Sequence, residues 1–431
     1  MFEQLIEQLD SKAHRSYVGI DMRNVLKDYL YGIEPSTISS TPEEIEDEQD
    51  RRVVFLLSCL SHVRRLQATE PRDKIFAMHA LYTNLGMQLP AADYTKSISR
   101  VYEDAAIAMI RWSRTLKVLG DVCHKSTSFP SWVPDFSDTD ITISTPRGKA
   151  TDGSRVVNGS TRILNPRPGE LCLRGRLVGR VVAWSHHDSI STIFPTRIEQ
   201  CQLPILTDQI DGLVEDVDTL RLWVDKINFL RQLYYFLQAN AEYGNGDAED
   251  TLIDLLNQDS LSEPNLAFNI WLDVLQYPET RYDLTWGETL VMRWKSAGTS
   301  KAEQWTPELT NCAVIIAALL SNQVRHNGQL LENTAEILDL LSQFSGNLND
   351  KAVIPVHLEL LGRTVIGTGV YSVAEGDSVA LLEGADWPII LRRLNTKWQF
   401  VGPAFVTGIM DGESWNLGSR PSFRMTQICL V

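Results

Sequence analysis

The pair of side chains best suited to acid–base chemistry in this sequence is Asp411 and Glu413. On extended backbone, residues i and i+2 project from the same face, about 7 Å apart. Inverting glycosidases hold their acid and base roughly 6.5 to 9.5 Å apart so that a water fits between them. A hydrolase that uses Asp411 and Glu413 is therefore one hypothesis. Gly408 and Gly412 favour a solvated turn here instead, and we prefer that interpretation.

Three other short motifs have a plain structural interpretation. His186, His187 and Asp188 cannot easily reach one metal ion, because adjacent residues at a strand end point to opposite faces. Residues 367–369 (Gly-Thr-Gly) lack the third glycine of a dinucleotide fingerprint, and Ser378 lacks the second glycine of a nucleophile elbow. We therefore predict no catalytic, cofactor-binding or metal-binding residues.

The cysteines and the N-terminus favour a cytoplasmic protein. The cysteines form no CxxC pair and have no histidines at zinc-finger spacing. They are Cys59, Cys123, Cys172, Cys201, Cys312 and Cys429. Residues 1–15 are charged and do not resemble a secretory signal, so we expect the chain to stay in the reducing cytosol. The longest apolar run, 312–320, is far below the ~20 residues that span a bilayer, which predicts no membrane insertion.

The charge balance argues against nucleic acid as a partner. Of 431 residues, 40 are Lys or Arg and 55 are Asp or Glu, which gives a net charge of −15 and a surface that repels phosphate backbones. The densest basic group is Arg64, Arg65, Arg72 and Lys74. It could receive an anionic ligand, or simply compensate the acidic run at 43–50. The sequence leaves the oligomeric state open.

Helical spacing dominates two parts of the chain. In the first part, helices are predicted at about 47–66 and 74–85, the second capped by Asp73 and ended by Gly86. A third helix follows a Thr95 cap and carries one apolar stripe from Ile98 to Leu116. The middle of the chain predicts further helices at 207–240, 247–258, 264–276, 284–297, 306–325 and 329–344. The first of these is a candidate contact surface, although the same pattern also fits a core helix.

The remaining segments read as a loop and strands. Residues 120–161 are rich in Ser, Thr, Pro and Gly, and 170–184 shows period-two strand spacing with a bend or bulge at Gly175 and Gly179. Short strands near the C-terminus suit a meander that curls into a small barrel. We predict an α+β fold: a mainly α-helical body with a small C-terminal β-barrel-like sheet that also takes in 170–184. The expected units are 1–50, 51–165, 166–185 with 346–431, and a helical insertion at 200–345.

Several motifs together resemble a known family. The stretches TEPRDKIFAMHALY (69–82), PAADYTKSISRVYEDAA (90–106) and FPSWVPDF (129–136) are similar, in order and spacing, to the region that follows the effector domain in fungal heterokaryon-incompatibility (HET) proteins. The runs 376–393 and 402–413 resemble the closing segment of that family. The resemblance reaches from about residue 50 to residue 415.

The same resemblance implies that the effector is missing. In that family the HET domain, which resembles the TIR fold and triggers cell death, precedes the PRDK-like motif, and residues 1–68 lack its signatures. The only Trp-Gly pair is Trp286–Gly287, far from that position. The resemblance therefore implies a non-enzymatic regulator or scaffold in non-self recognition and cell-death control. It would act through protein contacts, with full-length relatives as possible partners.

The motif residues also suggest a structural role. Arg72 can present its planar guanidinium group to a carboxylate, and Asp93 and Asp135 are the candidates. We predict a buried ion pair between Arg72 and one of them. Four tryptophans on apolar faces or between prolines are predicted to be core residues: Trp112, Trp132, Trp184 and Trp223.

Overall fold

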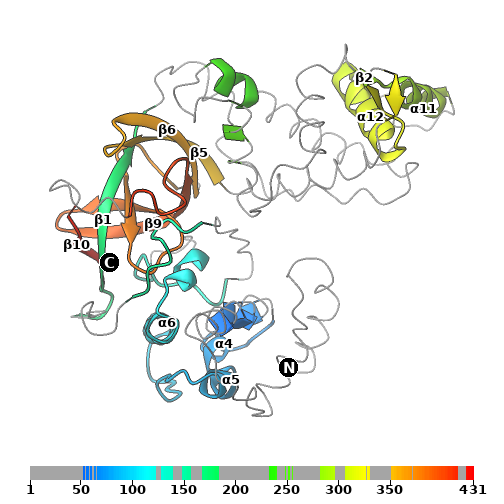
Figure 1. Cartoon of the computed structure of the whole chain (residues 1–431). Helices are drawn as coiled ribbons and strands as arrows, with labels where there is room; N and C mark the ends of the chain where they lie inside the picture. The colour runs from blue at the N-terminus through cyan, green and yellow to red at the C-terminus, as the bar shows by residue number, and fades with distance from the viewer. Residues whose placement is uncertain are drawn as a thin grey trace, which may run out of the picture.

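The computed structural model describes most of the chain beyond residue 65 and scattered residues before it. The continuous described ranges are 66–122, 128–138, 148–156, 167–183, 282–296, 306–326, 328–330, 351–370, 372–415 and 424–431, with single residues or short runs at 52–64 and 233–255. Within these ranges, a sheet lies above a group of helices in Figure 1, and a second helical group lies to one side.

The first helical group contains α4 (Asp73–Phe76) and α5 (His79–Asn84). The predicted single helix at 74–85 is thus interrupted at residues 77 and 78. Asp73 does not cap it, because Arg72 occupies the cap position and makes no side-chain cap bond. Gly86 does have a positive φ of 78°, which confirms the predicted left-handed end.

Helix α6 (Ile98–Ser113) carries the predicted apolar stripe into the core. Val101, Tyr102, Ala105 and Met109 are all buried, at three- and four-residue steps. The prediction of Thr95 as the cap is wrong, because the Ser97 hydroxyl accepts from the Arg100 backbone N–H at 3.2 Å.

Helix α6 also ends earlier in the sequence than predicted. Arg114, with φ 57°, ends α6 in the left-handed region before Leu116 is reached. A 3₁₀ turn, η1 (Lys117–Asp121), follows directly.

The largest described assembly is a mixed sheet of seven strands. Its strands are β1 (Leu171–Val181), β5 (Lys351–Leu358), β6 (Arg363–Val370), β7 (Ser378–Leu382), β8 (Ile389–Leu394), β9 (Lys397–Val406) and β10 (Thr426–Leu430). Their order is β10-β1-β5-β6-β9-β8-β7. The sheet is mixed because β10 contacts β9 in parallel while the other pairs are antiparallel.

Strand β1 joins the C-terminal strands, as the sequence predicts for residues 170–184. It pairs with β10 and β5, and also with β7, where the register shifts between Leu177 and Gly179. That shift is the predicted bulge. Both glycines are needed for close approach, because an added Cβ would lie 2.5 Å from the Leu381 carbonyl oxygen at Gly175 and 2.5 Å from that of His357 at Gly179.

The expected fold class is wrong in two respects. The described chain is not mainly α-helical, since its helices are few and short beside the sheet. The sheet is also not the expected small barrel, but a mixed sheet of seven strands. Local spacing shows where strands occur. It does not show how many of them pair or in which order, because pairing depends on contacts between distant segments.

The two faces of the sheet belong to two apolar clusters. Along β7, Ala380 and Leu382 pack with the helices, while Val379 and Leu381 pack with a second cluster built mainly from other strands. This alternation follows from the two-residue period of a strand. Both faces of β7 are therefore buried, and its sequence shows no polar alternation.

The second helical group contains α11 (Thr285–Ser296) and α12 (Pro307–Leu320), which confirm the helices predicted at 284–297 and 306–325. A small sheet of β2 (Tyr282–Asp283), β3 (Arg325–His326) and β4 (Gln329–Leu330) accompanies them. The helix predicted at 329–344 is wrong at its start, where β4 lies. The rest of that helix, and most of 200–280, fall outside the described residues. Among the helices described, none has the length and apolar character needed to cross a membrane.

One disulfide joins distant parts of the chain. Cys172 of β1 and Cys429 of β10 lie directly opposite each other in the antiparallel register and are bonded. The scattered cysteine spacing gives no sign of this pair, because the two residues are 257 positions apart.

Candidate functional site

The three motifs that carry the family resemblance meet around α4. The Tyr102 hydroxyl donates to the Pro71 carbonyl at 2.8 Å, and the Tyr94 hydroxyl donates to Asp73 Oδ1 at 2.6 Å. The Tyr102 ring also meets the Phe136 ring edge to face, with centroids 5.2 Å apart. Residues 69–82, 90–106 and 129–136 therefore form one structural unit, which we call the motif cluster.

The predicted ion pair of Arg72 is wrong. Arg72 donates to the Tyr94 carbonyl and pairs with Glu70 at 3.1 Å, so neither Asp93 nor Asp135 is its partner. Each aspartate instead accepts from a hydroxyl residue two positions later, Thr95 or Ser137, at 2.6 Å from the hydroxyl and 2.9 Å from the backbone N–H. Such local bonds form at little entropic cost and win over a distant cation.

The local bonds also change the ionisation of Asp93. Hydrogen bonds from the Thr95 hydroxyl and then from its backbone N–H lower the pKa of Asp93, because they favour the charged carboxylate.

The basic group does not form a surface patch. The Lys74 ammonium is buried and donates to the carbonyls of Val63 and Arg64, both at 3.0 Å, and to that of Leu66. Burial lowers the pKa of Lys74. Arg64 is also buried, 5.1 Å from the centroid of the Phe136 ring, and Arg65 lies outside the described residues. Lys74 therefore holds the preceding residues 63, 64 and 66 to α4, and both buried cations are poorly placed to receive an anionic ligand.

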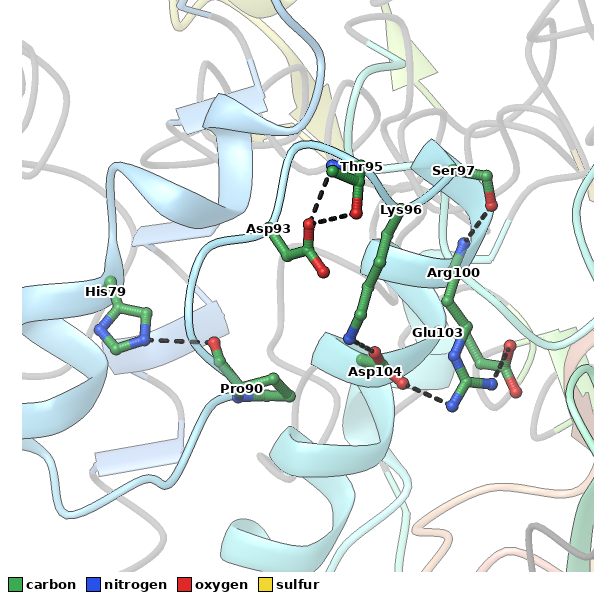
Figure 2. Close-up of polar contacts among 9 residues, drawn as sticks. All are labelled: His79, Pro90, Asp93, Thr95, Lys96, Ser97, Arg100, Glu103 and Asp104. Carbon is green, nitrogen blue, oxygen red and sulfur yellow. Dashed lines mark hydrogen bonds and ion pairs between the residues drawn. The ribbon is translucent and has the colours of Figure 1, made fainter.

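A surface hollow lies within the motif cluster, between α4–α5 and α6. Figure 2 shows polar side chains around it. The space in and above it is about 310 Å³, which includes open solvent, so the hollow is shallow. Its apolar lining comes from Ile75, Phe76, Leu89, Pro90, Ala91, Val101 and Ala105, and its polar lining from His79, Asp93, Lys96 and Asp104. An apolar floor with a few polar groups at the rim is typical of sites that receive a side chain or a small ligand.

Ion pairs order the rim of the hollow. Asp104 pairs with Lys96 at 2.9 Å and with Arg100 at 3.0 Å, and Arg100 also reaches Glu103 at 3.1 Å (Figure 2). On the opposite wall, the His79 Nε2 lies 3.3 Å from the Pro90 carbonyl oxygen. The rim is therefore a fixed pattern of alternating charge.

Several hydrogen bonds tie the motif cluster to the sheet. Glu103 Oε1 accepts from the Gly169 N–H at 2.7 Å, directly before β1, and the Trp132 Nε1 donates to the Gly169 carbonyl at 3.0 Å. Ser131 donates its N–H to the Val431 carbonyl at 2.9 Å, and its hydroxyl oxygen accepts from the Phe400 N–H at 2.8 Å.

Sequence reasoning missed these contacts. The sequence feature that indicates such a contact is Glu103, since a carboxylate within the apolar stripe of α6 needs a hydrogen-bond partner when it is buried.

The tryptophan predictions can be checked at two positions. Trp132 is fully buried, as predicted. Trp112 is half-buried and donates to the Leu85 carbonyl at 2.9 Å. Trp184 and Trp223 lie outside the described residues.

Asp411 and Glu413 lie on an exposed turn. Gly408 and Gly412, with φ of 82° and 83°, form the turn that the glycine spacing indicates. Glu413 Oε2 accepts from the Asp411 N–H at 3.0 Å, so this carboxylate is used to close its own turn. The hydrolase hypothesis needs a desolvated carboxylate, and both groups are exposed.

The weaker motifs have structural positions. Gly367, Thr368 and Gly369 lie within β6, and Ser378 begins β7. His186, His187 and Asp188 fall outside the described residues. Across the part of the chain that the structure describes, no group of three or more His, Cys, Asp or Glu side chains could hold a metal ion.

Comparison with known proteins gives no match: no family model fits the chain, and neither the curated proteins nor the solved structures contain a significant relative.

Proposed function

We propose that this chain is a non-enzymatic regulatory or scaffold protein related to fungal heterokaryon incompatibility, which acts in the cytoplasm through protein–protein contacts. The proposal starts from the resemblance of 69–82, 90–106 and 129–136 to the HET-protein region.

The observation that carries the proposal is the motif cluster itself. Hydrogen bonds of Arg72, Tyr94 and Tyr102 join 69–82 to 90–106. The Tyr102 ring also packs against Phe136 of 129–136, so the three motifs form one folded unit. The hollow between the first two motifs has an apolar floor and an ordered charged rim, which suits an apolar side chain of a partner protein surrounded by polar contacts. The net charge of −15 favours a protein partner over nucleic acid.

The test combines binding with a cell-death assay. A full-length HET-domain protein is co-expressed in hyphae with the wild-type chain or with Leu89→Lys, which adds a charge to the apolar lining of the hollow. We expect the wild-type chain to change the frequency of cell death on fusion, and the variant to bind the partner about tenfold more weakly.

Gln88→Lys is the matched control, because it adds the same charge at an exposed neighbouring position. It should bind like the wild type. If the wild-type chain neither binds the HET-domain protein nor changes the frequency of cell death, the proposed function is wrong. If Leu89→Lys and Gln88→Lys behave alike, the hollow is not the contact surface.

A further inference from the structure

We propose that the C-terminal segment 424–431 is a redox-controlled latch, which a thiol reductant releases by cleaving the Cys172–Cys429 disulfide. The latch is a conformational device of the sheet and does not depend on the proposed function.

The latch is a short segment held at several points. Strand β10 pairs with β1 over five residues, from Leu171↔Leu430 to Gly175↔Thr426, and meets β9 only at Leu430↔Trp398. Beyond the strand, the Val431 N–H donates to the Trp398 carbonyl at 2.9 Å. A ladder of five residue pairs is a weak attachment by itself, and the disulfide adds a covalent bond at the second of these pairs.

A buried cation lies beneath the latch. Arg176 of β1 is 5% exposed, and its described partners are Met425 Sδ, at 3.4 Å from Nε, the Ser414 carbonyl, at 3.4 Å from Nη1, and the ring of Trp415, with its centroid 5.3 Å from Cζ. No carboxylate is among them. A buried guanidinium without a counter-ion is costly, so the closed state carries a penalty that opening would remove.

The two sulfur atoms differ in access. Cys172 is buried, whereas Cys429 is half-buried, so we infer that an external thiol attacks at Cys429. A thiolate attacks Cys429 Sγ, a mixed disulfide forms, and Cys172 leaves as a thiolate that takes up a proton. A second thiol then attacks the mixed disulfide, which yields the Cys429 thiol and the disulfide of the reductant. Glutathione or a protein dithiol supplies the two electrons.

Release of the latch would also remove hydrogen bonds made by the motif cluster. Ser131 donates to the Val431 carbonyl through both its N–H and its hydroxyl group. When 424–431 leaves, Ser131 loses both bonds, and the loop 129–136 loses one of its attachments to the sheet. The redox state of one bond is thereby coupled to a segment 300 residues away in sequence.

The test uses hydrogen exchange on the purified full chain. Peptide mapping without reductant first establishes the Cys172–Cys429 linkage. On reduction, we expect amides in 424–431 and 129–136 to exchange at least about tenfold faster, while α6 and the β5–β6 pair keep their protection. A Cys172→Ser/Cys429→Ser double variant should show the fast exchange with or without reductant.

A second variant tests the role of the buried cation. Arg176→Met replaces the charge with an apolar side chain of similar length, so in the reduced protein it should slow exchange of 424–431 about tenfold relative to the reduced wild type. Arg174→Met, on the exposed side of the same strand, is the control and should not change it.

Three results would overturn the latch: absence of the linkage in the purified chain, unchanged exchange of 424–431 on reduction, or loss of protection throughout the sheet. The last result would identify the bond as a general structural staple. If reduction loosens 424–431 but Arg176→Met exchanges like the reduced wild type, the cation does not drive opening, and that part of the inference fails.

Discussion

Two buried cations in two regions of this molecule have very different surroundings. Lys74, in the motif cluster, is 6% exposed and donates to three backbone carbonyls. Arg176, in the sheet, is 5% exposed and has one carbonyl, one sulfur atom and one aromatic ring. Two equally buried cations can therefore differ in how many good hydrogen-bond acceptors they contact. The bonds of Lys74 stabilise the motif cluster, whereas we infer that the desolvation cost of Arg176 opposes the packing of 424–431 over it.

The largest expected effect comes from removing the satisfied cation. Lys74→Met should lower the free energy of unfolding by about 3 kcal/mol, because three carbonyls lose their donor in a buried place. Chemical denaturation measures it. Lys96→Met is the control: its ion pair with Asp104 is partly exposed, and the loss should stay below about 1 kcal/mol. Equal losses in the two variants would contradict the role given to Lys74.

The poorly satisfied cation should give an effect of opposite sign. Arg176→Met should leave the free energy of unfolding unchanged or raise it by about 1 kcal/mol, since an apolar side chain has no charge to desolvate. The same denaturation experiment on the oxidised protein measures it. If the variant instead loses about 2 kcal/mol or more of unfolding free energy, as expected when a buried charge network is broken, the three partners of Arg176 compensate its burial. The contrast drawn between Arg176 and Lys74 would then be wrong.

Arg72 is less buried than either of these two cations. Its side chain is 19% exposed, pairs with Glu70 and donates to the Tyr94 carbonyl. Arg72→Met should therefore lower the free energy of unfolding by about 1 kcal/mol, with helix content unchanged by circular dichroism. An unaltered thermal unfolding curve would show that these contacts contribute nothing.

The smallest expected effect is a pH dependence in the motif cluster. The pKa of Asp93 is lower in the folded chain than in the unfolded one, because Thr95 bonds favour the carboxylate. Its contribution to stability is present above the ordinary carboxyl pKa and is lost as pH falls through the lowered folded value. Asp93→Ala should flatten the acid limb of a stability-against-pH curve slightly. An identical acid limb in wild type and variant would contradict this.

Much of the local structure could be predicted because it depends on residues close in sequence. The stripe of α6, the turn at Gly408 and Gly412, and the helices α11 and α12 all follow from spacing. The cap of α6 was misplaced by two residues, since Thr95 and Ser97 are both good caps and only the path of the chain selects between them.

The sequence by itself determined which segments form α6, α11, α12 and β1, how strongly acidic the chain is, and which motifs resemble the HET region. The tertiary structure alone decided that seven strands share one mixed sheet, that Arg72 contacts Tyr94 and Glu70, and that Cys172 meets Cys429. The reason is physical: capping and periodicity are properties of neighbouring residues, but the partner of a strand, a cation or a thiol is selected by which distant surfaces pack together.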